Sequence, residues 1–396
     1  MFLNSVGPID QFSDTFQADS SRFSFASSPM LSAAASFAVL SQMQQVVGSV
    51  VESEMFELIE IMIRYGHNPD GIPALHYAIK MEDERAVKLL LDHGADPNAK
   101  ARDINRWSEH FPEEKPLMAI EYAAVTGNMN IIRMLVDEGA IIKDYEEYNP
   151  CFHHFYFTPL RYAIISDHPK VIAYLVSCGA LGDGLFHDQE ELSAAVLTAV
   201  RYGSINVLEW LKKEGVNYKQ QNVKNPHLVH IAVQSNQPKI LEFLLGERLN
   251  PNGKYPGSDQ TPLHDAVRLV NLECIDLLID FNSDPNALDC SGNTPLGCAI
   301  IADPQKPIFD VVKKLIDLGA NVNHVGSYGT PLISAVQQMH HHSNYSSKYM
   351  KCCEYLLSHG ANINAADKYG RNVLFYAKQN KNQVLIDWLI AHGARD

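Results

Sequence analysis

The sequence lacks the residue patterns that mark disulfide-rich, secreted and nucleic-acid-binding proteins. Its seven cysteines are an odd number, and their spacing does not resemble a disulfide framework, which favours a reducing compartment. Basic residues are scarce, with 32 Lys and Arg against 46 Asp and Glu, for a formal net charge of −14. A phosphate-backbone partner needs clustered Lys and Arg, so we expect no nucleic acid as a partner. The N-terminus has no basic segment of the kind that opens a secretory signal.

Long apolar runs and the motifs of common nucleotide and zinc enzymes are also missing. The most apolar stretch, residues 31–51, contains several Ser and Gln residues, which favours a buried helix over a membrane span. Neither a G-x-x-x-x-G-K-[ST] phosphate-binding loop nor an H-E-x-x-H zinc motif occurs. The sequence therefore predicts a cytoplasmic protein, or one of the host cytosol if it is a secreted effector. We expect no membrane span, no cofactor and no metal.

The chain contains an internal repeat. Its 396 residues are too many for one ordinary compact core. One phrase recurs along it: an apolar helix ending in Gly-Ala, a polar link, then Thr-Pro-Leu at the start of a second apolar helix. Examples of the ending are LLLDHGADPNA from Leu89 and LLSHGANIN from Leu356. Examples of the start are TPLHDA from Thr261 and TPLGCA from Thr294. Phrases that recur in phase predict a solenoid of stacked units.

The alanine that closes each start measures the period. Successive copies lie 33 to 45 residues apart, at Ala78, Ala123, Ala163, Ala199, Ala232, Ala266, Ala299, Ala335 and Ala377. The shortest spacings match the ankyrin period of about 33 residues. The TPLHxA and LLxxGAxxN phrases resemble the ankyrin-repeat family over roughly residues 72–396. The resemblance implies an all-α fold, an ankyrin-repeat α-solenoid of nine helix pairs with β-hairpin-like finger links.

The chemistry of these phrases agrees with the resemblance. Thr261 can accept a hydrogen bond from a free N–H at the start of its helix, and Pro262 sits where a missing N–H costs nothing. Ala266 is small, so it lets the paired helices approach closely. Gly follows most of the second helices, where a left-handed cap prefers that residue. Arg248 takes the place of this Gly in the fifth repeat, so we expect that repeat to end irregularly.

The remaining sequence divides into three parts. Residues 1–30 predict a disordered Ser-rich tail, and their scattered Phe residues leave a docking motif open as an alternative. Residues 31–70 contain two helical patterns that resemble a degenerate N-terminal capping repeat, which a solenoid needs because a terminal repeat has one face without a neighbour. Residues 71–396 are predicted to form the repeat array.

Two insertions, at residues 103–116 and 143–157, lengthen consecutive finger links. Extra length in a repeat array often lies on the binding face, and exposed aromatic side chains gain nothing from water. We therefore predict a monomer that grips another protein, with a basic or apolar surface, through finger residues. The alternative is that the loops fold back and bury their own rings. The predicted partner-binding residues are Trp107, Phe111, Tyr145, Tyr148, Phe152, Tyr156, Tyr255, Tyr328 and Tyr369.

Three smaller features suggest other chemistry. Cys151 has two His residues close by, but no orienting third group is evident for a nucleophilic pair. A run of three His residues precedes two adjacent Cys residues (His340, His341, His342, Cys352 and Cys353) without the paired spacing of a zinc site. Asn323 and Asn364 lie in segments that resemble ankyrin segments hydroxylated on Asn by an oxygen-sensing dioxygenase. The resemblance also implies structural roles for the histidines of the TPLH phrase, His76, His230 and His264.

These observations predict a non-catalytic scaffold or adaptor that binds a partner protein through its finger loops and concave face. A narrower prediction is a pathogen effector that acts in a host cell, because stand-alone arrays are common there. The alternative is an enzyme or enzyme subunit that uses the loop around Cys151.

Overall fold

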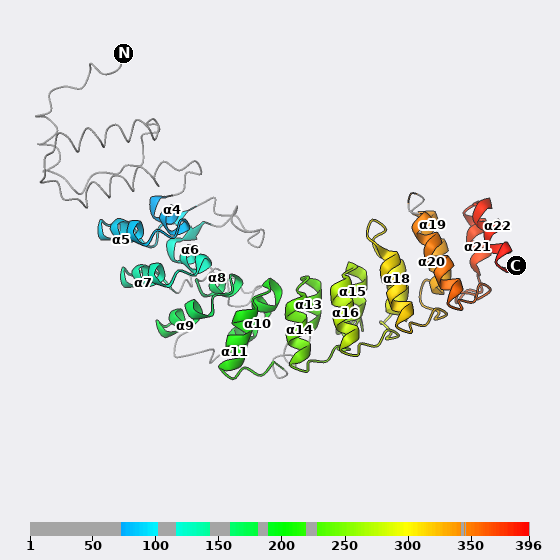
Figure 1. The fold of residues 1–396 in the computed structure, drawn as a ribbon, viewed down its shortest axis with the longest axis horizontal. Coiled ribbons are helices and arrows are strands. Elements are labelled where there is room, and N and C mark those ends of the chain that lie inside the picture. Colours follow the sequence, from blue (N-terminus) through cyan, green and yellow to red (C-terminus); the bar gives the residue numbers. More distant parts are fainter. Residues whose placement is uncertain are drawn as a thin grey trace, which may run out of the picture.

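The computed structural model describes residues 73–101, 116–142, 159–180, 189–218, 228–341, 344 and 346–395. Eighteen helices lie within these ranges and form the nine predicted pairs. The pairs follow one another in a curved, elongated array (Figure 1). They are α4 Ala74–Lys80 with α5 Glu84–Asp92, α6 Ala119–Thr126 with α7 Met129–Asp137, α8 Pro159–Ile165 with α9 Pro169–Ser177, α10 Gln189–Tyr202 with α11 Ile205–Lys213, α13 Leu228–Gln234 with α14 Pro238–Gly246, α15 Pro262–Leu269 with α16 Leu272–Asp280, α17 Pro295–Ile300 with α18 Ile308–Asp317, α19 Pro331–His341 with α20 Ser346–Ser358, and α21 Val373–Gln379 with α22 Gln383–Ala391.

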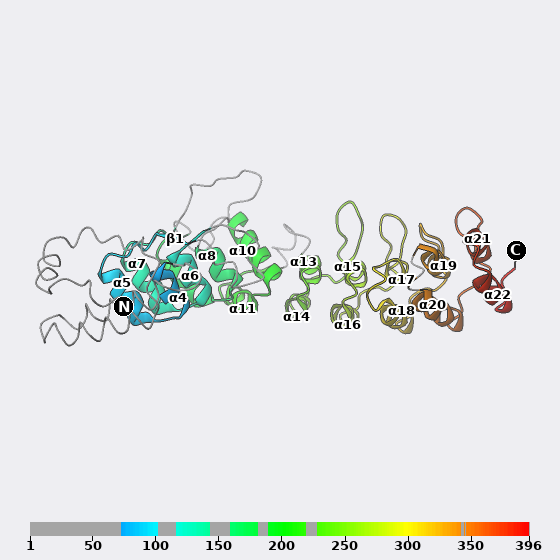
Figure 2. The ribbon, with the colours of Figure 1, turned by 90° about the horizontal axis from the view of Figure 1, so that it is seen from above.

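The helices form two layers. The first helices of the pairs lie in one layer and the second helices in the other (Figure 2). Each first helix packs against its own second helix and against the first helix of the next pair, as α13, α14 and α15 do. The core is therefore one continuous strip between the layers, and each repeat depends on its neighbours for burial.

The alanines that set the period lie inside this core. All nine are buried, with at most 1% of their surface exposed. This burial agrees with their predicted role of letting helices pack at short range. A larger side chain at these positions would have no free space to occupy.

The helix starts follow the predicted capping chemistry with one correction. The hydroxyl groups of Thr294 and Thr330 each accept a hydrogen bond from a backbone N–H three residues further on, at 3.3 Å. Thr261 does not cap its helix in this way, because its hydroxyl lies 2.8 Å from Nδ1 of His264 instead. The histidine of the TPLH phrase thus replaces the helix N–H as the partner of the threonine hydroxyl.

The helix ends also correct one prediction. Gly319 and Gly360 take the expected left-handed conformation, with φ of 84° and 87°. Arg248 adopts the same conformation, with φ of 62°, and its N–H donates to the carbonyl of Leu245 at 2.9 Å. The expectation that the fifth repeat ends irregularly was therefore wrong, because the N–H groups of Arg248 and the buried Leu249 close this helix end by hydrogen bonds to Leu245 and Leu244.

The finger links are hairpin-like where the structure describes them. Strand β1, Lys100–Ala101, pairs antiparallel with β2, Leu117–Met118, on either side of the first insertion. A single bridge joins Gly326 to Gly329 in the link before α19. Among the described residues, no helix is both long enough and apolar enough to cross a membrane.

Candidate functional site: the finger edge

Most of the predicted partner-binding residues fall outside the described ranges. Trp107 and Phe111 belong to the first insertion, and Tyr145, Tyr148, Phe152 and Tyr156 belong to the second. Cys151 and its neighbouring histidines also lie there. Their roles therefore stay predictions, as do the N-terminal tail and the capping repeat.

The three remaining predicted residues lie in links between later repeats. Tyr255 precedes α15, Tyr328 precedes α19 and Tyr369 precedes α21, and their exposed fractions are 39%, 49% and 66%. The links before α15, α17 and α21 project as loops from one edge of the array (Figure 2). Two further exposed apolar side chains, Leu288 in the link before α17 and Val325 in the link before α19, were not among the predicted residues. Their exposure could not be inferred from residue type, because apolar side chains are usually buried.

We call these five residues, Tyr255, Leu288, Val325, Tyr328 and Tyr369, the finger row. Each of four consecutive links contributes at least one apolar side chain to it. Large apolar side chains that are exposed together often mark an interaction site.

A ladder of asparagine side chains holds each link against the next. Asn286 donates from Nδ2 to the carbonyl of Gly319 at 3.2 Å, and its Oδ1 accepts from the N–H of Asn321 at 2.7 Å. Asn323 makes the same pair of bonds to Gly360 and Asn362, at 2.9 and 2.7 Å. Equivalent pairs start from Asn98, Asn252 and Asn364. The ladder fixes the spacing between neighbouring finger links.

This ladder bears on the predicted hydroxylation of Asn323 and Asn364. Both residues are exposed, but both amide groups are bonded to the following repeat. Their structural role is a sufficient reason for Asn at this position. Hydroxylation stays a prediction.

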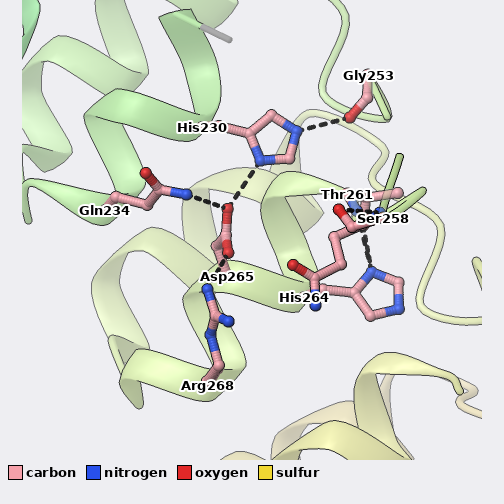
Figure 3. Close-up of polar contacts among 9 residues, drawn as sticks. His230, Gln234, Gly253, Ser258, Thr261, His264, Asp265 and Arg268 are labelled. Atoms are coloured by element: carbon pink, nitrogen blue, oxygen red, sulfur yellow. Dashed lines mark hydrogen bonds and ion pairs between the residues drawn. The ribbon is translucent and has the colours of Figure 1, made fainter. Parts of the chain in front are cut away.

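A buried polar network lies at the base of the link before α15 (Figure 3). Nδ1 of His230 is 2.8 Å from Oδ2 of Asp265, and its Nε2 is 2.9 Å from the carbonyl of Gly253. Both partners are acceptors, so only the protonated ring donates to both at once. Gln234 and Arg268 donate to the same carboxylate at 2.9 and 2.7 Å. The network joins the fifth repeat, the link and the sixth repeat.

The electrostatics of Asp265 favour its charged form. Burial works to raise the pKa of this carboxyl group, but hydrogen bonds from His230 and Gln234 and the nearby Arg268 charge hold it below its ordinary value. Both carboxylate oxygens are occupied, and so are both ring nitrogens of His230. Each of these polar atoms has a partner within the array, which gives the pair a structural role in joining the fifth and sixth repeats.

Burial disfavours thiolate chemistry at the buried cysteines. Burial raises the pKa of Cys274 to about 11 and that of Cys352 to about 12, which leaves little thiolate near neutral pH. Cys352 and Cys353 are fully buried against their helix neighbours. The side chains of the preceding His340–His342 run lie outside the described residues, so the expectation of no metal there stays a prediction.

The last link is held by a second cluster of polar contacts. Oδ1 of Asp367 accepts from the backbone N–H groups of Tyr369 and Arg371 at 2.8 and 2.9 Å. Its Oδ2 accepts from the Arg371 side chain at 2.9 Å and from the Tyr376 hydroxyl at 2.6 Å. The Arg371 guanidinium also lies over the Tyr369 ring, 4.4 Å from the ring centroid. The most exposed ring of the finger row is thereby held in place.

Comparison with known proteins identifies the same repeat. The family described as ankyrin repeats in three copies matches residues 229–325 and 306–396, and the family of the single ankyrin repeat matches residues 70–102. Together these matches span about half of the chain.

Curated relatives share parts of the array. The chain is 29% identical over 172 residues to ankyrin repeat protein FPV014 of Fowlpox virus (strain NVSL), a stretch that covers 43% of this chain and 36% of that protein. It is 27% identical over 238 residues to a Danio rerio protein named as a palmitoyltransferase, ZDHHC13, covering 59% of this chain and 34% of that one. It is 26% identical over 180 residues to Inversin of Homo sapiens, covering 45% and 16%. The chain thus spans about a third or less of these relatives.

Proposed function

Because the chain belongs to the ankyrin-repeat family, whose repeats are protein–protein interaction modules, we propose that it is a non-catalytic scaffold or adaptor. Its partner is a protein that lies along the finger edge, the edge of the array from which the links between repeats project. The observation that carries this proposal is the finger row, in which apolar side chains are exposed in four successive links. Such side chains gain free energy when a partner removes them from water, and Tyr is among the commonest interface anchors.

Preorganisation of the rings supports the same proposal. Tyr369 lies against the Arg371 guanidinium, and Tyr255 makes an edge-on contact with the buried His230 ring, with 5.5 Å between ring centroids. A side chain that is already restrained loses less conformational entropy when a partner binds. More of the free energy gained by burying these two rings therefore remains as binding affinity than for freely rotating side chains.

The chemistry of the partner follows from the finger edge and the charge of the chain. An apolar strip fits an apolar strip on the partner, and the formal net charge of −14 favours a basic rim around it. The two aromatic insertions also belong to links between repeats, and their aromatic residues are proposed to take part in binding. The six cysteines within the described ranges are free thiols, which supports placing the complex in a reducing compartment such as the cytosol.

Two other predictions have less support. The relatives come from a virus, a fish and a human, so they do not favour a pathogen effector over a cellular adaptor. An enzyme would have to use the Cys151 loop, which lies outside the described residues. Replacing Cys151 with Ala distinguishes a scaffold from an enzyme. A scaffold should still bind its partner and keep its effect, whereas an enzyme that uses Cys151 should lose its activity.

A capture experiment tests the proposed function. The intact chain is used as bait beside two variants, one without residues 103–115 and 144–156, and one carrying Tyr328→Ser and Tyr369→Ser. Val384→Ser is the matched control, because Val384 is 80% exposed but lies on α22, away from the fingers. We expect a specific partner to be retained by the intact chain and the control and reduced with both finger variants. A partner retained equally by all four proteins would contradict the proposal.

A further inference from the structure

Three metal-binding side chains of different chemistry meet between the sixth and seventh repeats. His264 comes from α15, Asp289 from the following finger link and Cys298 from α17. One ligand atom of each lies within 4.8 Å of the other two, and no other group of three such side chains occurs in the described part of the chain. Imidazole, carboxylate and thiolate are the three ligand types that proteins use for zinc.

The cluster arises from the repeat register. His230 and Asp265 occupy the fourth and fifth positions of the TPLHxA start in successive repeats, and they are bonded to each other. His264 and Cys298 occupy the same two positions one repeat later. A thiol thus stands where the preceding junction has a carboxylate. The ligands are separated by 25 and 9 residues in the sequence, so no short motif indicates them.

The carboxylate ligand, Asp289, is oriented by its own link. Oδ1 of Asp289 accepts from the N–H groups of Ser291 and Asn293 at 2.9 and 2.8 Å, and Oδ2 has only a longer contact of 3.3 Å to the Asn293 amide. The carboxylate is therefore fixed by one oxygen while the other remains available. Such outer contacts orient a ligand before the ion arrives.

The ring of His264 can present its second nitrogen. Nδ1 is 2.8 Å from the hydroxyl of Thr261, and Nε2 is 3.2 Å from the carbonyl of Asn293. In the tautomer with the proton on Nδ1, the ring donates to the Thr261 hydroxyl and leaves the lone pair of Nε2 for an ion. In this tautomer the ring loses two hydrogen bonds. One is the contact of Nε2 with the Asn293 carbonyl, and the other is the 3.2 Å bond that Nδ1 accepts from the Thr261 N–H.

We propose that His264, Asp289 and Cys298 bind a divalent cation of the zinc class and so link the sixth and seventh repeats. Bond lengths of about 2.0 to 2.3 Å place ligand atoms of a tetrahedral zinc site roughly 3.3 to 3.8 Å apart. The three ligand atoms lie within 4.8 Å of one another, so they need to close by at most roughly 1.5 Å. Water takes the fourth position. As the sulfur–metal bond forms, the Cys298 proton passes to solvent.

Charge and burial fit this ion. The thiolate and carboxylate together carry two negative charges, which a divalent cation neutralises. Arg268, the nearby cation, is already paired with Asp265 at 2.7 Å. Without an ion, burial raises the pKa of Cys298 to about 12, so the apo thiol is protonated and metal binding releases a proton.

Cobalt(II) titration of the chelator-treated full chain tests this site. A background with His340, His341 and His342 replaced by Ala removes one run of imidazole ligands from the sequence. We expect one equivalent of cobalt to give thiolate-to-cobalt absorption, and zinc to displace it. Cys298→Ser should abolish this absorption, and Asp289→Asn should weaken affinity at least tenfold. Cys290→Ser is the matched control and should bind like the parent, because Cys290 is exposed and lies outside the cluster.

Circular dichroism of each apo variant establishes that the array is folded. If Cys298→Ser does not fold, the cobalt affinity of Asp289→Asn tests the site instead. This variant should stay folded, because its amide oxygen can still accept the hydrogen bonds from the link backbone. Absence of thiolate-to-cobalt absorption in the parent would overturn the proposal. Equal affinity in the parent and in the folded variants would also overturn it, because that result shows adventitious binding only.

Discussion

The side-chain amide of Asn323 donates a hydrogen bond to the carbonyl of Gly360 in the next repeat, at 2.9 Å. The oxygen of the same amide accepts from the N–H of Asn362 at 2.7 Å. One side chain therefore connects two repeats through both of its polar atoms. It also holds the links that carry Tyr328 and Tyr369 at a fixed spacing.

Replacing Asn323 with Ala should lower the free energy of unfolding by about 1 to 3 kcal/mol, because two inter-repeat hydrogen bonds are lost together. Thermal or urea unfolding measures the change. Val325→Ala serves as the control, since Val325 is exposed in the same link and should change stability by less than about 0.5 kcal/mol. Equal stability of the Asn323 variant and the parent would show that the ladder contributes nothing.

Ala266→Leu should destabilise the sixth repeat by roughly 1 to 3 kcal/mol through overpacking, because Ala266 is fully buried between helices. The loss should appear first as reduced hydrogen-exchange protection in repeats five to seven, since each repeat packs only on its neighbours. Ala391→Leu, at an exposed helix end, is the matched control. Unchanged protection in those three repeats would show that Ala266 is not at a close contact.

Val270 is strained where α15 ends. This β-branched residue has a φ of 57°, a conformation that costs an L-residue roughly 1 to 2 kcal/mol. Val270→Gly should therefore raise the free energy of unfolding, by up to about 1 kcal/mol after the loss of some apolar contact. The same substitution at helical, exposed Val384 should lower it by about 0.5 to 1 kcal/mol. A fall in stability for both variants would contradict the account of strain.

Asp367 should make the array sensitive to acid. Burial works to raise its pKa, but hydrogen bonds from Tyr376, Arg371 and the Tyr369 N–H hold it at about 2 in the folded chain. An unfolded Asp has a pKa of about 3.9. The folded pKa is the lower one, so the stabilisation is present above pH 4 and is lost as the pH falls from about 4 to 2.

Melting temperatures measured across that pH range test the assignment. Asp367→Asn should be less stable than the parent at neutral pH and should lose less stability on acidification. Asp387→Asn, an exposed position on α22, is the control and should follow the parent. Parallel pH curves for Asp367→Asn and the parent would exclude Asp367 as the acid-sensitive group.

The fold was predictable because its signals are local and repeated. The alanine series and the TPL starts located all nine helix pairs, because each start fixes one helix cap and one close contact. Arg248 was misjudged because the hydrogen bonds that close its helix and the burial of the following Leu249 outweigh intrinsic backbone preference. The cap at Thr261 was misassigned because the following His264 competes for the hydroxyl group.

The site was less predictable, because it depends on contacts between repeats. Tyr328 and Tyr369 could be selected by residue type and position. The contact of the Arg371 guanidinium with the face of the Tyr369 ring could not be predicted in that way. The grouping of His264 with Cys298 likewise depends on how one repeat stacks on the next.

Partner affinity of matched double variants tests the central claim most directly, once a partner has been captured. Tyr328→Ala with Tyr369→Ala removes the two most exposed rings of the finger row. Val384→Ala with Ile390→Ala removes two apolar side chains from α22 that are at least half exposed. We predict that the finger pair weakens binding at least roughly tenfold with little change in melting temperature, and that the α22 pair leaves the dissociation constant unchanged. Trp107→Ala and Tyr148→Ala should each act like the finger pair. Unchanged affinity in all the finger variants would contradict the account.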